Sequence, residues 1–267
     1  MFLSNKLCFI ELEKTAVNYI RETFQANINN GKIIGAHNFV NENLIKKKLL
    51  FVGSIRNPYD WYISRWSYGC FRQYNDSLYK NFLKKRLRLS RNQEIQKNNI
   101  KKINFFFNQL FKSSIYWKKL YENSNDPNNF RIWLKSFLAS EKSKDLAEHY
   151  YFSSLFKKFG YLTFKYLLMF TRPNNRQMLF DDSIVSQNDI RIFDEKNNYI
   201  NKFIKFETLD KDIDNILKIL GVNFNEKLDK LNVSKRVTDT DFYFDTETKD
   251  LIWEYDEYIF QKHNYKY

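Results

Sequence analysis

Two short stretches of the chain place cationic and hydroxyl side chains where an apolar run ends and a helical pattern begins. In "VGSIRNPYDWYISRW" (52–66), Arg56 follows the apolar residues and Ser64 comes later in the helical pattern. Lys14 and Thr15 stand at the same kind of junction nearer the N-terminus. A cation beside the free N–H groups of a helix N-terminus suits a phosphate or sulfate group. The spacing alone is equally compatible with an arginine that caps a loop and a serine that faces solvent.

The elements around these residues predict an α/β fold with a parallel sheet, because strand patterns alternate with helical ones. Continuous apolar runs or β-like patterns predict strands over 6–14, 48–55 and 201–209. Apolar residues at helical spacing predict helices over 15–24, 210–221 and 245–263, and a further helix that opens at Pro58. In such sheets ligands bind beyond the carboxyl ends of the strands, where both cations would stand.

Composition limits the class of protein and the kind of partner. The 267 residues are enough for one large α/β domain or two small ones. The formal net charge of +13 favours an anionic partner: nucleic acid, a phosphorylated cofactor, an acidic polysaccharide or a membrane surface. Neither cysteine belongs to a C-x-x-C pair, so no metal or redox motif is indicated. The apolar runs are too short for a signal peptide or a membrane span, so we expect a soluble, cytoplasmic protein.

Taken together, "CFIELEKTAVNYIRETF" and "FVGSIRNPYDWYISRW" resemble the sulfotransferases that use 3′-phosphoadenosine 5′-phosphosulfate. The likeness is to the branch of carbohydrate and heparan-sulfate-type enzymes, whose first motif runs F-I-H-I-P-K-T-[AG]-G-[ST]. "RNPYDxxxS" is similar to the second and more specific motif of the family. The segments 174–180, 203–222, 231–236 and 257–267 resemble later family segments, whereas no motif matches within 71–150.

The resemblance implies a fold, a reaction and roles for particular residues. It implies one sulfotransferase domain over 1–267, with the three-layer fold of P-loop nucleoside triphosphatases and a central parallel sheet flanked by helices. The aromatic and basic region 71–150, which no family motif covers, is predicted to be helical from its own sequence, and in such a domain it would be an insertion that shapes the acceptor cleft. The enzyme would move a sulfuryl group to a hydroxyl, expected to be that of a carbohydrate, without a metal. The cofactor would be bound at its 5′-phosphosulfate by Lys14 and Thr15, at its 3′-phosphate by Arg56 and Ser64, and elsewhere by Ala16, Asn18, Tyr19, Lys235 and Arg236.

The base that takes the acceptor proton is less well defined by the sequence. His37 in "GAHNF" lies between the two motifs, and an imidazole suits the task, although a purely structural histidine is the competing interpretation. The first motif also departs from the family pattern, with Glu11 in place of histidine and Glu13 in place of proline. Two carboxylates beside an anion site are unfavourable unless they pair with cations. One of them is therefore an alternative base, and a protein that binds the cofactor without catalysis is a further alternative.

Two other function classes compete with this interpretation. A nucleic-acid-binding protein would explain the charge, but no zinc, helix-turn-helix or RNA-recognition motif is present. A nucleotide kinase would explain Lys14-Thr15, but the G-x-x-x-x-G-K-[ST] pattern and a metal-binding acidic strand are missing. The basic run at 80–97, continued at 101–102, is either a solvated helix face or a wall of the acceptor cleft.

Overall fold

The computed structural model describes residues 1–71, 78–85, 99–146, 148–224 and 236–267. The chain divides into two compact units. The first unit comprises residues 1–57, 165–177 and 190–233, and the second comprises 58–164, 178–189 and 234–267. The expectation of a single domain over 1–267 stays a prediction.

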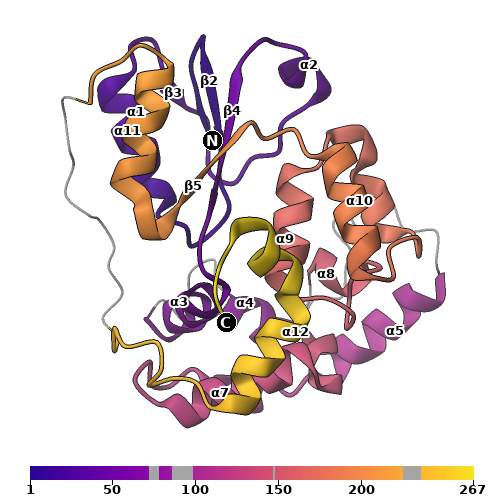
Figure 1. The fold of residues 1–267 in the computed structure, drawn as a ribbon. Helices are drawn as coiled ribbons and strands as arrows, with labels where there is room; N and C mark the ends of the chain where they lie inside the picture. The colour runs from indigo at the N-terminus through magenta and orange to yellow at the C-terminus, as the bar shows by residue number, and fades with distance from the viewer. Residues whose placement is uncertain (72–77, 86–98, 147, 225–235) are drawn as a thin grey trace. The chain divides into compact units, whose positions relative to one another are not determined.

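The first unit contains a five-stranded mixed sheet in the order β3-β1-β2-β4-β5, with helices on its faces. Three strands, β2 (Leu7–Ile10), β4 (Leu50–Ile55) and β5 (Lys202–Lys205), are parallel to one another. They fall within the three predicted strands, so the prediction of an α/β fold is confirmed. Figure 1 shows these strands side by side.

The predicted parallel sheet is confirmed for β2, β4 and β5, but the sheet is mixed, because one of its edges is antiparallel. There β1 (Phe2–Leu3) pairs antiparallel with both β2 and β3 (Lys32–Ile33). The hydroxyl of Ser4 accepts hydrogen bonds from the backbone nitrogens of Lys6 and Leu7, at 3.2 and 3.0 Å, and so closes a tight turn between β1 and β2. A turn this short cannot make the crossover that a parallel pair requires.

The core of the first unit lies between the sheet and two helices, α1 (Val17–Asn27) and α11 (Leu209–Ile219). Apolar residues at helical spacing face the sheet and meet the alternate residues of β2 and β4. The buried residues of this cluster include Phe9, Val17, Ile20, Phe24, Val52, Ile204, Ile213, Ile216 and Leu217. On the opposite face of β4, Gly53 leaves room for two aromatic rings, since a Cβ there would lie 2.8 Å from Phe203 and 3.1 Å from Phe170.

The second unit is helical in its described part and has an aromatic core. Four tryptophans, Trp61, Trp66, Trp117 and Trp133, are fully buried. The helices of the unit are α3 (Pro58–Phe71), α4 (Leu78–Leu83), α5 (Asn99–Leu110), α6 (Ser114–Leu120), α7 (Pro127–Leu138), α8 (His149–Phe152) and α12 (Thr246–His263), with the 3₁₀ helix η2 (Glu141–Asp145). The predicted helices at Pro58 and over 245–263 are therefore confirmed.

Five further elements complete the described chain. The short helix α2 (Glu42–Ile45) and the 3₁₀ turn η4 (Phe206–Thr208) belong to the first unit. The chain passes from one unit to the other within α9 (Tyr161–Phe170), η3 (Pro173–Phe180) and α10 (Gln187–Asn197). Among the residues described, no helix has the length and apolar character that crossing a membrane requires.

A buried carboxylate lies at the centre of the second unit. Asp256 is fully buried inside α12, at a kink where its φ is −115°. Its carboxylate accepts hydrogen bonds from the Tyr62 hydroxyl at 2.7 Å, and from the Thr163 backbone nitrogen and hydroxyl at 2.8 and 2.7 Å. A Cβ added at Gly160 would lie 2.1 Å from Asp256 Oδ2, so the carboxylate fills the space where a side chain at residue 160 would stand.

Candidate anion-binding site

The candidate site lies at the carboxyl ends of β2 and β4. These strands are adjacent and parallel, with Ile10 opposite Gly53, so the loop after β2 and the end of β4 meet at one edge of the sheet. Arg56 is 7% exposed, and its Nη1 donates a hydrogen bond to the Lys14 carbonyl oxygen at 3.0 Å. The guanidinium carbon lies 3.8 Å from the ring centroid of Phe206, which follows the neighbouring strand β5. Two predicted cations thus belong to one edge of one sheet.

The loop between β2 and α1 has an unusual backbone. Lys14 and Ala16 both have positive φ values, 67° and 61°, and Ala16 occupies the position before α1 without a side-chain hydrogen bond to the helix. Residues of this conformation, alternating with ordinary ones, turn successive N–H groups toward a common concavity that favours anions. The N-terminus of the eleven-residue helix α1 adds its own unsatisfied N–H groups to the same place.

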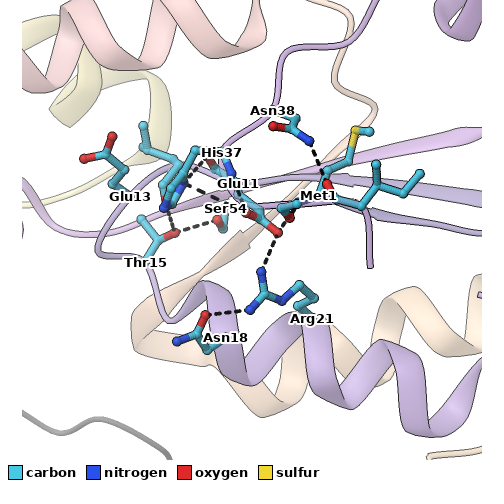
Figure 2. Close-up of polar contacts among 12 residues, drawn as sticks. Met1, Glu11, Glu13, Thr15, Asn18, Arg21, His37, Asn38 and Ser54 are labelled. Carbon is cyan, nitrogen blue, oxygen red and sulfur yellow. Dashed lines mark hydrogen bonds and ion pairs between the residues drawn. The ribbon is translucent and has the colours of Figure 1, made fainter. Parts of the chain in front are cut away.

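A pair of buried hydroxyls fixes this loop. Thr15 is fully buried, and its Oγ1 donates to the Leu12 carbonyl oxygen at 2.7 Å. The same oxygen lies 2.6 Å from Ser54 Oγ on β4 (Figure 2). Since Thr15 uses its single hydrogen on Leu12, Ser54 must be the donor of the second bond. In this conformation the Thr15 hydroxyl holds the loop to the sheet, and only its backbone N–H is left for an anion.

Glu11 is a fully buried carboxylate that is surrounded by donors. It contacts the amino group of Met1, lies 3.6 Å from Arg21 Nη1, and accepts a hydrogen bond from the His37 backbone nitrogen at 2.8 Å. Figure 2 shows these partners gathered around the carboxylate. A base must reach the acceptor hydroxyl and carry a lone pair that is not already engaged. The geometry therefore favours a structural role for Glu11, which joins β2 to α1 and to the segment that carries His37.

Glu13 is turned away from Glu11, as Figure 2 shows. Its side chain is 23% exposed, and Oε1 lies 3.0 Å from the Nζ of Lys165. Each of the two carboxylates that depart from the family pattern is thus neutralised by a nearby cation. The electrostatic objection to an anion site at this loop is correspondingly reduced.

His37 lies beside the end of β2, in a left-handed backbone conformation with φ of 51°. Its side chain is 40% exposed. Nδ1 is 3.3 Å from the carbonyl oxygen of Glu11. A carbonyl oxygen only accepts, so Nδ1 carries the hydrogen in this contact, and Nε2 keeps the lone pair that a base requires.

Three residues at the start of α1 have different surroundings. Ala16 contributes only backbone to the loop. Asn18 is exposed, and its Oδ1 accepts a hydrogen bond from Arg21 Nη2 at 3.0 Å. Tyr19 is 3% exposed and donates to Asp210 Oδ1 at 2.8 Å. Burial, together with the neighbouring Asp210 carboxylate, raises the pKa of Tyr19 to about 12. Tyr19 thus ties α1 to α11 in the core.

The remaining predicted site residues belong to the second unit or are not described. Ser64 is buried within α3. Arg236 forms an ion pair with Asp60, the aspartate of "RNPYD". Lys235 lies outside the described residues, as do most of the segment 231–236 and residues 86–97 of the basic run.

Sequence reasoning missed four residues that shape the site. Ser54 and Lys165 fix the loop and Glu13, as described above. Phe206 stacks on Arg56, and Glu207 accepts a hydrogen bond from the Asn57 backbone nitrogen at 2.7 Å. The last two belong to the F-E-x-L segment after β5, whose strand end adjoins that of β4. Both residues lie near the end of the predicted strand over 201–209, and this position at a third strand end could have marked them as site residues.

Comparison of the chain with models of known families, with curated proteins and with solved structures finds no match. Within the described ranges, no group of three or more histidine, cysteine, aspartate or glutamate residues could hold a metal ion. The interpretation of the site therefore depends on its own geometry.

Proposed function

We propose that the protein is a sulfotransferase that moves a sulfuryl group from 3′-phosphoadenosine 5′-phosphosulfate to a hydroxyl. The branch of the family that the sequence resembles points to the hydroxyl of a carbohydrate. The observation that carries the proposal is the hydrogen bond between Arg56 Nη1 and the Lys14 carbonyl, at 3.0 Å, across the carboxyl ends of two adjacent parallel strands. It joins the two motifs on which the family resemblance depends. A parallel core with an anion-binding loop before its first helix also supports a P-loop-like fold.

The residues at this edge fit a ligand with two separated anionic groups. The left-handed residues Lys14 and Ala16 shape a backbone concavity for one group, and the lysine adds a charge. Arg56 supplies a guanidinium that is held over the Phe206 ring by a cation–π contact. Glu11 and Glu13, which would repel such a ligand, are each paired with a cation. The family resemblance alone assigns Ser64, Lys235 and Arg236 to the cofactor, and the proposal keeps that assignment.

The reaction requires charge stabilisation and one proton transfer from the chain. The nucleotide, when bound, supplies an activated sulfuryl group. Lys14 and the loop N–H groups would stabilise negative charge on the oxygens at the reacting centre, by the same positioning and electrostatics that serve phosphoryl transfer. Arg56 would orient the nucleotide. His37 would accept the proton of the acceptor hydroxyl at Nε2, while its Nδ1–H stays bonded to the Glu11 carbonyl.

Ligand-induced thermal stabilisation tests the cofactor half of this proposal. Adenosine 3′,5′-bisphosphate should raise the melting temperature of the full chain, because a ligand that binds only the folded state stabilises it. ATP with magnesium should have much less effect. Stabilisation by ATP alone would favour a nucleotide kinase, and stabilisation by RNA or DNA alone would favour a nucleic-acid-binding protein. Either result would contradict the proposal.

An acceptor screen with a sulfate-labelled donor tests the catalytic half, beginning with glycans. Transfer of label to one class of acceptor would support the assignment. Tight binding of the bisphosphate with no transfer to any acceptor, and no slow hydrolysis of the donor, would indicate a cofactor-binding protein without catalysis. The two assays therefore separate the failure of binding from the failure of chemistry.

A further inference from the structure

The helix α5 has one buried face that anchors it in the second unit. Phe105 is fully buried, and its ring centroid lies 5.1 Å from that of Phe152 and 5.8 Å from that of Tyr151. Gln109, one turn further on, is also fully buried. This face therefore holds α5 on the rest of its unit.

The opposite face of α5 is apolar as well, yet it is exposed. We call it the α5 stripe: Ile100, Ile103, Phe107 and Leu110, with Phe111 directly after the helix, which are 71%, 54%, 56%, 48% and 82% exposed. Residues separated by three, four and seven positions share one face of a helix, so these side chains form a continuous row. Water-exposed apolar rows of this kind mark a surface that another body covers.

Lysines surround one end of the α5 stripe. Lys85, which is exposed and directly follows α4, donates from Nζ to the Leu110 carbonyl oxygen at 2.7 Å. On α6, Ile115 is 86% exposed, and the exposed Lys118 and Lys119 follow it by three and four residues, on the same helical face. Lys80 and Lys84 are exposed on or next to α4. The apolar row thus ends next to Lys85, and further exposed lysines lie on α4 and α6, the helices before and after it in the chain.

Acidic residues are nearly absent from this part of the chain. The described residues 78–85 and 99–121 contain eight lysines and no aspartate or glutamate, and the next acid along the chain is the exposed Glu122. From elsewhere in the second unit, the exposed Asp182 lies 3.8 Å from Lys101 on α5. Lysines therefore outnumber acids among the described residues on and next to the α5 stripe.

We propose that the α5 stripe and the lysines beside it dock the protein on an anionic lipid bilayer. An amphipathic helix in the plane of a membrane buries large aliphatic and aromatic side chains in the acyl region, and its flanking lysines pair with anionic headgroups. A nucleic acid or an acidic polysaccharide would use the lysines but would leave Ile100, Ile103 and Leu110 in water. A second copy of the chain would bring an equally positive surface against this one, and that repulsion opposes self-association.

Vesicle co-sedimentation tests this docking surface with the full chain. The protein should sediment with phosphatidylcholine vesicles that contain phosphatidylserine, and much less with phosphatidylcholine alone. Phe107→Glu should lower the partition coefficient about tenfold or more, since burial of one phenylalanine is worth roughly that factor. Lys118→Gln with Lys119→Gln should weaken binding about fivefold per lysine on acidic vesicles. High salt should weaken it in the same direction.

Ile132→Glu is the matched control, because Ile132 is 46% exposed on α7 of the same unit, away from α5 in the chain. It should bind vesicles like the wild type, and circular dichroism should show that both variants are folded. Equal binding by the Phe107→Glu and Ile132→Glu variants would overturn the proposal. So would binding that ignores phosphatidylserine, or self-association in light scattering that Phe107→Glu abolishes while vesicles are not bound.

Discussion

The buried carboxylate of Asp256 gives a quantitative prediction about stability and pH. In the folded chain, burial raises the pKa of Asp256 from 3.8 to about 6, against the hydrogen bonds from Tyr62 and Thr163, which lower it. No lysine or arginine forms an ion pair with Asp256 within the described ranges, so the charged form lacks the partner that usually offsets desolvation. Replacing Asp256 by asparagine keeps the shape of the side chain and removes its titration.

The direction of the change in stability with pH depends on which state, folded or unfolded, binds the proton of Asp256. Between about pH 4 and pH 6 the folded state holds a proton on Asp256 that the unfolded state has already released. Wild-type stability therefore gains from this group as pH falls through 6, and most of the gain is present at pH 4. A pKa difference of about two units corresponds to about 3 kcal/mol. The free energy of unfolding of the wild type, relative to Asp256→Asn, should rise by about that amount from pH 7 to pH 4.

Tryptophan fluorescence during urea unfolding is a suitable assay, because all five tryptophans belong to the unit that contains Asp256. The difference between wild type and variant matters, since carboxylates that both proteins share cancel in it. Asp239→Asn, a change at an exposed position of the same unit, provides the control and should show little pH-dependent difference. A wild-type-minus-variant difference that stays constant from pH 7 to pH 4, or grows in the opposite direction, would refute the reasoning.

The other predictions concern the proposed site and one contact of Asp256. Arg56→Ala should weaken the binding of adenosine 3′,5′-bisphosphate about tenfold to a hundredfold, with Arg56→Lys in between, as measured by titration calorimetry. If the Arg56→Ala variant bound the bisphosphate as tightly as the wild type, Arg56 would not be a cofactor-binding residue. Lys14→Ala should lower kcat more than it weakens cofactor binding, and a variant with normal kcat would contradict the assigned role. At saturating cofactor, His37→Ala should reduce turnover about 10²-fold or more; full turnover would exclude His37 as the base and leave Glu13, whose side chain is partly exposed, as the candidate. Gly160→Ala should cost about 3 kcal/mol in urea unfolding, because its Cβ would overlap the carboxylate of Asp256, and a neutral effect would mean that the carboxylate can move.

The sequence was sufficient for the elements that have strong periodic signals. The strand at Leu7–Ile10 is a continuous apolar run, and Ile213, Ile216 and Leu217 place one face of α11 on the sheet. In contrast, β1 and β3 contain two residues each, which is too short for any periodicity to be read. Their antiparallel pairing comes from a local turn at Ser4 and not from the hydrophobic pattern. The edge of the sheet was for that reason unpredictable.

In the candidate site, too, some contacts could be predicted from the sequence and others could not. The meeting of Lys14 and Arg56 could be predicted, because adjacent parallel strands bring their carboxyl ends to one edge. The partners of Glu11 and Glu13 could not, since Arg21 lies on the next helix and Lys165 is about 150 residues away in the chain. A single sequence contains no signal for such long-range ion pairs. It indicates only that a buried carboxylate must have partners of some kind.

The left-handed backbone at Lys14 has a consequence for which amino acids this position can hold. A non-glycine residue there costs on the order of 1 kcal/mol, which a glycine would not incur. A Lys14→Gly substitution would remove this penalty, but it would also remove the ammonium group. At Lys14 the backbone conformation favours glycine, whereas the residue present carries a positive charge. Backbone strain of this kind is typical of residues at functional sites.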